Sequence, residues 1–161
     1  MAEEFDFSKM KNAKADVFEK YMKDEGLDFF QRRDVKDAYD TTVFVTMIPA
    51  GKHRVPVALI TNNSMYVLLR AHMGTAPVGP AAKTFLHFLS RQNAESSLFK
   101  YLIAEDNNVF LDVCFPCVGN SFDPAVVRTT LNLIVYHMQD HYEDIARRLA
   151  KTSEETDGFS L

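Results

Sequence analysis

The sequence predicts an α+β fold, in which helices pack on a mostly antiparallel β-sheet of about five strands. Three observations lead to this class. Apolar residues recur at helical spacing in three segments, near the start, the middle and the end of the chain. The segments between them are β-branched or alternate apolar with polar residues, and short turns join them. Because strands joined by short turns pair antiparallel, the expected order of elements is α-β-β-β-α-β-β-α.

The first helix is expected to begin after Ser8, a suitable N-cap residue, and to end at Gly26. The apolar residues at helical spacing within it are Met10, Ala13, Val17, Tyr21 and Met22. Residues 27–31 are consistent with a short strand. The polar residues 32–40 are then expected to form a connection to the next strand.

Three strands are expected after this connection, over residues 41–48, 54–61 and 65–73. The second contains Pro56, which has no backbone N–H to donate and therefore favours an edge position or a bulge. The third alternates strongly. Its apolar side is expected to present Met65, Val67, Leu69 and Ala71.

The second helix is expected to open at Gly79-Pro80, because proline suits a first helical position, and to end at residues 91–93. A hairpin of strands 97–104 and 109–118 follows. If its turn centres on Asp106 and Asn107, Tyr101 lies opposite Asp112 and Phe99 lies opposite Cys114. One face of the hairpin then holds Leu98, Leu102, Ala104, Val109, Leu111, Val113 and Phe115, and the other holds Phe99, Tyr101, Ile103, Phe110 and Asp112.

The last helix is expected over about residues 124–151, with Asp123 as N-cap and Pro124 at its first position. Its apolar stripe consists of Val127, Leu131, Val135, Met138, Tyr142, Ile145 and Leu149. Residues 1–151 are long enough for a single domain with its own core. The polar tail 152–161 is expected to be disordered.

The stretch "FLHFLSRQNAESSLFKYLIAEDNNVFLDVCFP", together with the order of elements, resembles the YbjN family, which has the type III secretion chaperone-like fold. The resemblance covers about residues 5–150. It matches a helix ending near Asn93, two strands around the turn 105–108, closure near Pro116 and a long C-terminal helix. The family is described as bacterial sensory-transduction regulators without an agreed activity. The related chaperones are small acidic cytoplasmic dimers that hold extended segments of a secreted partner.

Composition is ordinary for a globular protein, with 47% apolar and 25% charged residues in a chain of 161. No apolar run approaches ~18 residues, so no membrane span is expected. The acidic N-terminus lacks an apolar leader segment, and two cysteines are too few for a disulfide scaffold. These observations indicate a cytoplasmic protein.

The net charge of −4 is unevenly distributed. Residues 41–90 contain four basic and no acidic residues, whereas the rest carry the other 14 of the 18 basic residues and all 22 acidic ones. One explanation is that residues 41–90 are rich in strands and therefore carry few charges of either sign. The alternative is a mildly basic sheet face that meets an acidic peptide or helix. Four cations in this block are too sparse for a nucleic-acid partner.

The second hairpin face is the main indication of a protein partner, because an antiparallel sheet that faces water should be polar there and this face is apolar. Coverage by the first helix of the same chain is one explanation; a dimer interface or a peptide groove is the other. The residues expected to contact a partner are Phe99, Tyr101, Phe110, Met65 and Val67, with Arg54 and Arg70 providing charge selection.

Two residue pairs suggest redox chemistry or metal binding, and each also has a simpler structural interpretation. Cys114 and Cys117 form a C-x-x-C within a strand, which places the thiols on opposite faces unless Pro116 bends the chain. His137 and His141 share one helix face, which suits a metal site, but no further histidine is near in sequence. No serine or glycine motif of a known catalytic site is present.

The sequence therefore favours a non-catalytic cytoplasmic binding protein, a homodimer with a chaperone-like or regulatory role. It would capture an extended or helical peptide on an apolar sheet face, without a cofactor or a metal. A thiol-redox or metal-dependent enzyme that uses Cys114 and Cys117, or His137 and His141, is the alternative. A structural subunit of a larger assembly is a third interpretation.

Overall fold

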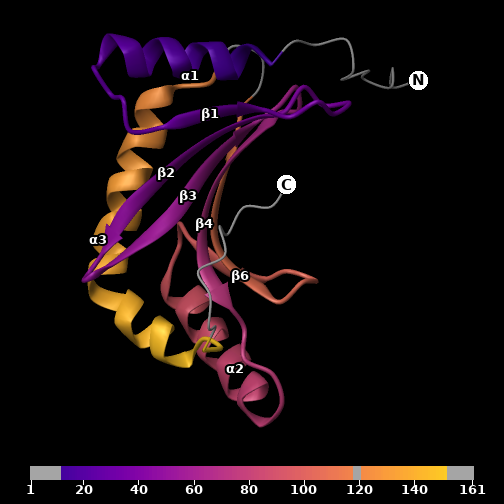
Figure 1. Ribbon diagram of the computed structural model, residues 1–161, viewed down its shortest axis with the longest axis vertical. Coiled ribbons are helices and arrows are strands. Elements are labelled where there is room, and N and C mark those ends of the chain that lie inside the picture. Colours follow the sequence, from indigo (N-terminus) through magenta and orange to yellow (C-terminus); the bar gives the residue numbers. More distant parts are fainter. Residues whose placement is uncertain (1–11, 118–120, 152–161) are drawn as a thin grey trace. The chain divides into compact units, whose positions relative to one another are not determined.

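The computed structural model describes residues 12–117 and 121–151. Ser8, Met10, residue 118 and the tail from Thr152 lie outside them. The elements are labelled in Figure 1: α1 (Ala13–Asp24), β1 (Gln31–Asp34), β2 (Thr42–Ala50), β3 (His53–Thr61), β4 (Tyr66–Thr75), α2 (Pro80–Glu95), β5 (Lys100–Ile103), β6 (Asn108–Pro116) and α3 (Pro124–Arg148). The strands form one sheet of six, in the order β1-β2-β3-β4-β6-β5. The predicted α+β class with an antiparallel sheet is confirmed, with one strand more than expected.

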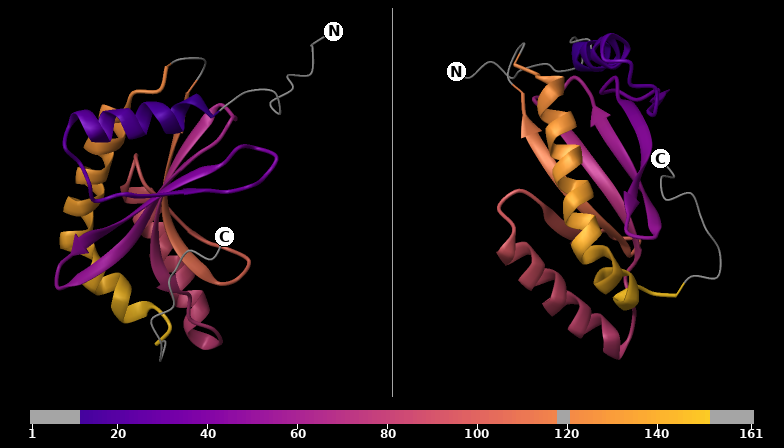
Figure 2. Two further views of the ribbon diagram at one scale, coloured as in Figure 1. Left: turned by 45° about the horizontal axis from the view of Figure 1, so that its top comes forward. Right: turned by 90° about the vertical axis from the view of Figure 1, so that its left-hand side faces the viewer.

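β4 and β6 are neighbours in the sheet although α2 and β5 separate them in the chain. Cys117 N–H donates to the Met65 carbonyl at 2.7 Å, and Ala76 N–H donates to the Asn107 carbonyl at 2.8 Å. These bonds lie at opposite ends of the pair, so the two strands run antiparallel. β5 is thus the last strand of the sheet, and α2 lies beside it (Figure 2).

The chain forms two compact units, which are described separately below. Among the described residues, the first unit holds 12–46, 58–69, 114–117 and 121–130. The second holds 47–57, 70–113 and 131–151.

In the first unit, α1 begins at Ala13 because Asn12, rather than the expected Ser8, is its N-cap. The Asn12 side-chain oxygen accepts a hydrogen bond from the Ala15 N–H. Its amide nitrogen donates to the hydroxyl of Thr61 at 3.0 Å. A buried asparagine thus satisfies the helix start and ties it to the end of β3.

The prediction of a strand at 27–31 followed by a connection at 32–40 was wrong, because the first strand is Gln31–Asp34. This strand pairs antiparallel with β2, with Arg32 opposite Phe44. All four of its residues are exposed. Their polar sequence gives no strand signal, since pairing with β2 rather than intrinsic propensity forms the strand.

Pro56 was expected to mark an edge position or a bulge, and the edge position was wrong. Pro56 lies in β3, between β2 and β4 in the sheet. β3 is one of the most buried strands, with Val55, Val57 and Leu59 fully inaccessible to solvent. Burial of these side chains offsets the one backbone hydrogen bond that a proline removes from the sheet.

In the second unit, the predicted register of the hairpin was wrong by one residue, because Tyr101 lies opposite Leu111 and not Asp112. Two bonds close the turn: Ala104 N–H donates to the Asn108 carbonyl, and Asn107 N–H donates to the Ala104 carbonyl. The loop therefore has three residues and ends with Asn107 at a φ of +64°. The shift moves Tyr101 from the predicted second face to the face of Leu111, where it is buried.

The apolar stripe of α3 differs from the prediction, because Val135, Tyr142 and Leu149 are only partly buried and Ile134 was not expected. Ile134 is fully buried. The buried residues of this helix are Val127, Thr130, Leu131, Ile134, Met138 and Ile145. A step of seven residues from Val127 to Ile134 keeps the stripe on one face of the helix.

Candidate functional site: the α1–β1 groove

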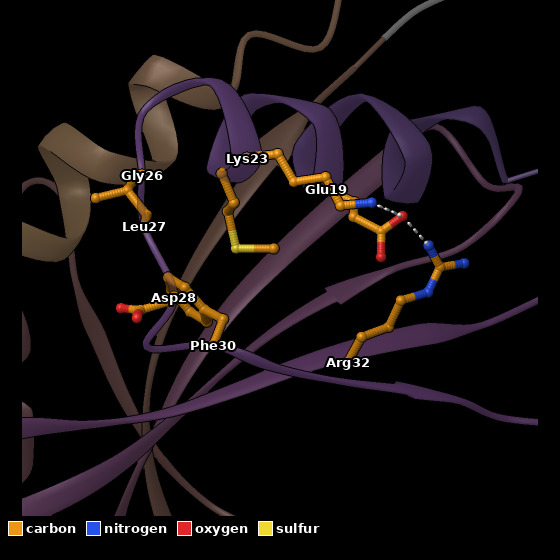
Figure 3. A pocket seen from close by; sticks show the side chains of 8 residues that line it. Glu19, Lys23, Gly26, Leu27, Asp28, Phe30 and Arg32 are labelled. Atoms are coloured by element: carbon orange, nitrogen blue, oxygen red, sulfur yellow. Dashed lines mark ion pairs between the residues drawn. The ribbon is translucent and has the colours of Figure 1, made fainter.

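A groove of about 490 Å³ lies in the first unit, between α1, the loop that follows it and β1. Figure 3 shows the side chains that line it. They are Glu19, Met22, Lys23, Gly26, Leu27, Asp28, Phe30 and Arg32, and together they define the α1–β1 groove. Helix and edge strand thus each provide one wall.

The inner part of the groove is apolar. Met22 is buried, and Leu27 and Phe30 are partly buried. The Phe30 ring packs edge-to-face on Phe18 with 5.4 Å between ring centroids, and Phe18 packs in the same way on Phe44 of β2 at 4.9 Å. This chain of aromatic contacts holds α1 over the sheet and fixes the width of the groove.

The rim of the groove is charged, and Arg32 is at its centre. Its guanidinium lies 3.2 Å from Glu19 and 3.5 Å from Asp16 of α1, and its Nε donates to Asp34 at 3.0 Å. Hydrogen bonds from the Thr42 hydroxyl and from Arg32 lower the pKa of the Asp34 carboxyl. Arg32 is therefore a charged residue of an edge strand that points toward the helix, a device that discourages unselective pairing of sheet edges.

The backbone of β1 leaves hydrogen-bonding groups unused on the side away from β2. Val35 N–H donates to the Thr41 carbonyl at 2.8 Å, so these two residues form a hydrogen-bonded pair. Because such pairs alternate in an antiparallel ladder, Arg33 and Gln31 also bond to β2, while the backbone groups of Arg32 and Asp34 point outward. We call this outward side of β1 the open edge.

The other end of the sheet, at β5, is different because a side chain occupies the outward backbone groups of its residue Tyr101. The Asn93 amide oxygen accepts from Tyr101 N–H at 2.6 Å, and its amide nitrogen donates to the Tyr101 carbonyl at 2.9 Å. The side chain of Asn93 thus takes the place of a neighbouring strand at Tyr101. The backbone groups of Ile103 also point outward, because Ala104 bonds to Asn108. β1 differs in that its outward residues, Arg32 and Asp34, lie beside a groove.

We expect Asn93→Ala to lower the free energy of unfolding by about 1–3 kcal/mol, because two buried backbone groups lose their partners. It should also make the protein associate as its concentration rises, since the outward backbone groups of Tyr101 on β5 are then unpaired. Thermal melting and light scattering over a dilution series measure the two effects. A variant that melts at the wild-type temperature and stays monomeric to the same concentration would contradict this account.

The residues predicted to contact a partner lie in both units. Met65 and Val67 belong to the first, where Met65 is exposed and Val67 has no accessible surface. Arg54, Arg70, Phe99, Tyr101 and Phe110 belong to the second. Arg54 is exposed, and its guanidinium donates to the Met47 carbonyl at 3.4 Å.

Phe110 and Arg70 form a contact that the sequence did not suggest. Arg70 donates two hydrogen bonds to Asp112, at 2.9 and 2.7 Å, and its guanidinium lies 4.5 Å from the centroid of the Phe110 ring. Phe110 is only 8% exposed. The second hairpin face is thus covered at this point by side chains of the same chain.

Phe99 and Tyr101 meet at His137 of α3. The Tyr101 hydroxyl lies 2.7 Å from His137 Nε2, and the Phe99 ring lies 4.9 Å from the imidazole centroid. The His141 ring stacks on His137 at 4.4 Å. Burial, with a contribution from His141, lowers the pKa of His137 from 6.5 to about 4, and burial raises the pKa of Tyr101. His137 is therefore neutral at physiological pH.

Cys114 lies in β6, and Cys117 directly follows the end of that strand. Cys114 is exposed and Cys117 is buried, and both are reduced. β6 stays extended through Pro116, which separates the two Cα atoms by about 10 Å, whereas a disulfide needs less than about 7 Å. Burial raises the pKa of Cys117, against the opposing effect of nearby Lys14. This geometry does not favour a dithiol redox pair.

Among residues 12–117 and 121–151, no group of three or more His, Cys, Asp or Glu side chains is arranged to hold a metal ion. None of the helices in these ranges combines the length and the apolar character that a membrane span needs. No family model matches the chain, and no curated protein matches it.

Sequence reasoning missed the α1–β1 groove, because it treated Arg32 as part of a polar connection. One signal was available. Three apolar residues, Leu27, Phe29 and Phe30, stand directly before the four polar residues 31–34, as at an edge strand that begins beside a helix. Phe29 remains 49% exposed at the same place.

Proposed function

We propose that this protein is a non-catalytic binding module that takes up an extended segment of a partner protein as an added strand on β1. The observation that carries the proposal is the open edge beside an apolar groove. Backbone hydrogen bonds from Arg32 and Asp34 would provide affinity, and the groove would receive an apolar side chain.

The proposed site differs from the sheet face expected from the sequence, and two observations support the change. Arg70 already pairs with Asp112 and covers Phe110, and Val67 and Tyr101 are core residues. The likeness of the element order to the YbjN family agrees with strand capture, since the related chaperones hold extended segments. A cytoplasmic location and a homodimer remain part of the proposal from the sequence alone.

The test is to block the open edge without changing the sheet. Asp34→Pro removes an outward N–H, which β2 does not use, and proline is tolerated on an edge strand in that orientation. Asp34→Ala is the matched control, because it loses the same carboxylate and keeps the N–H. The probe is a displayed library of random peptides, and thermal melting verifies that both variants fold.

Peptides selected on the wild-type protein should also bind the Asp34→Ala variant and should bind Asp34→Pro about tenfold or more weakly. A library that yields no binder, or binders that Asp34→Pro holds as tightly as Asp34→Ala, would overturn the proposal. If β1 pairs with β1 of a second copy instead, light scattering would show a dimer that Asp34→Pro alone dissociates.

A further inference from the structure

Carboxylates outnumber cations around the α1–β1 groove. The charged residues that line it or bind Arg32 are Asp16, Glu19, Asp28, Asp34, Lys23 and Arg32. Four negative and two positive charges leave a local charge of −2. Lys23 lies 3.5 Å from Glu19, so both cations already share the same carboxylate. The excess of negative charge is therefore spread over the other three carboxylates, those of Asp16, Asp28 and Asp34.

Two of these carboxylates keep capacity to accept further hydrogen bonds. The contacts of Asp16 and Asp34 with Arg32 use one oxygen of each carboxylate, Oδ1 in both residues. Their side chains are 79% and 64% exposed. A second cation could approach either carboxylate without displacing Arg32, since an ionised carboxylate accepts bonds on both oxygens.

The strand geometry places Asp34 where an added strand would meet it. Phe30 and Arg32 both line the groove, and Asp34 bonds to Arg32, so alternate residues from Phe30 to Asp34 share one face. The backbone groups of Asp34 point to the open edge. A residue of the added strand that lies opposite Asp34 would have its Cβ about 5 Å from that of Asp34.

From this arrangement, we infer that the segment bound at the open edge carries a lysine or arginine opposite Asp34 and an apolar residue beside Phe30, four positions away on the same face. The inference rests on the proposed function and specifies the chemistry of its partner segment. The carboxylates around the groove would repel an acidic residue opposite Asp34. Acidic segments are therefore selected against. The partner segment is thus selected both by an apolar residue that contacts Phe30 and by a positive charge at one defined position.

The test uses the peptides selected from the displayed library, resynthesised with their basic residue replaced by glutamate. On wild-type protein, the replacement should weaken binding about tenfold or more. On the Asp34→Asn variant, the difference between the two peptides should shrink severalfold. Asp24→Asn is the matched control. Asp24 is an exposed residue of α1 in the same compact unit, pairs with Lys20 and does not line the groove.

The outcomes separate the two proposals. Peptides that Asp34→Pro no longer binds, but that carry no basic residue or tolerate its replacement, would overturn the charge rule and leave strand addition intact. A charge preference that Asp34→Asn and Asp24→Asn reduce equally would reflect net charge alone and would also overturn it. A library without binders sensitive to Asp34→Pro would refute both.

Discussion

Replacing Phe18 with alanine is expected to lower the free energy of unfolding by about 3–5 kcal/mol, the range for a large buried aromatic side chain. Phe18 is 2% exposed and contacts Phe30 and Phe44 through edge-to-face packing. Its loss leaves a cavity between α1 and β2 and removes the contact that positions Phe30 in the groove. Chemical denaturation monitored by circular dichroism measures the change.

The same substitution should weaken the binding of peptides selected on the wild-type protein, because the helix wall of the groove loses its support. Val17→Ala is the matched control, since Val17 is the preceding residue of α1 and is 43% exposed. We expect a change within about 1 kcal/mol for this control. Similar losses for the two variants would mean that Phe18 does not connect α1 to the sheet as described.

Acidification is the second large effect, because His137 is held neutral by burial. Its pKa of about 4 in the folded protein lies below the ordinary value of 6.5. Between these values the unfolded chain binds more protons than the folded one, so stability falls as the pH is lowered from 6.5 to 4. Above 6.5 this residue contributes no pH dependence. The full shift would correspond to about 3 kcal/mol, and partial solvent exposure reduces this to about 1–2 kcal/mol.

The His137→Gln variant tests this, because glutamine does not titrate and its side-chain amide can form a hydrogen bond with the Tyr101 hydroxyl in either direction. The difference in unfolding free energy between wild type and variant should shift by about 1–2 kcal/mol in favour of the variant between pH 7 and pH 4. His87→Gln, at an exposed position of α2, controls for the loss of a histidine. A difference that stays constant over this range would show that His137 is protonated in the folded protein with an ordinary pKa.

Asn93 and Arg32 show how the two outermost strands differ. Asn93 satisfies the outward backbone groups of Tyr101 with its own side chain, so a further strand could not bond to β5 at that residue without displacing Asn93. Arg32 instead places a charge beside an edge that keeps its backbone groups available. β5 is thus capped by hydrogen bonding at Tyr101, whereas β1 is protected from unselective pairing by charge.

Local sequence signals determined the order of the elements other than β1, the antiparallel sheet and most strand positions. The alternation of Val67, Leu69 and Ala71 predicted the buried side of β4, and these residues are fully buried. Pro80 marked the start of α2 correctly. These features follow from periodicity and from the backbone preferences of proline, which act within a few residues.

Only the tertiary structure decided β1, the hairpin register and the groove. Gln31–Asp34 has no strand pattern and pairs because β2 supplies its hydrogen bonds. The register depended on Asn107 adopting a positive φ, which turned an assumed four-residue loop into one of three. The Arg70–Asp112 pair joins residues 42 positions apart, and Arg32 meets Asp16 and Glu19 across the groove. Contacts between residues far apart in sequence leave no periodic signal, so side-chain packing and ion pairing in the folded chain are what fix the candidate site.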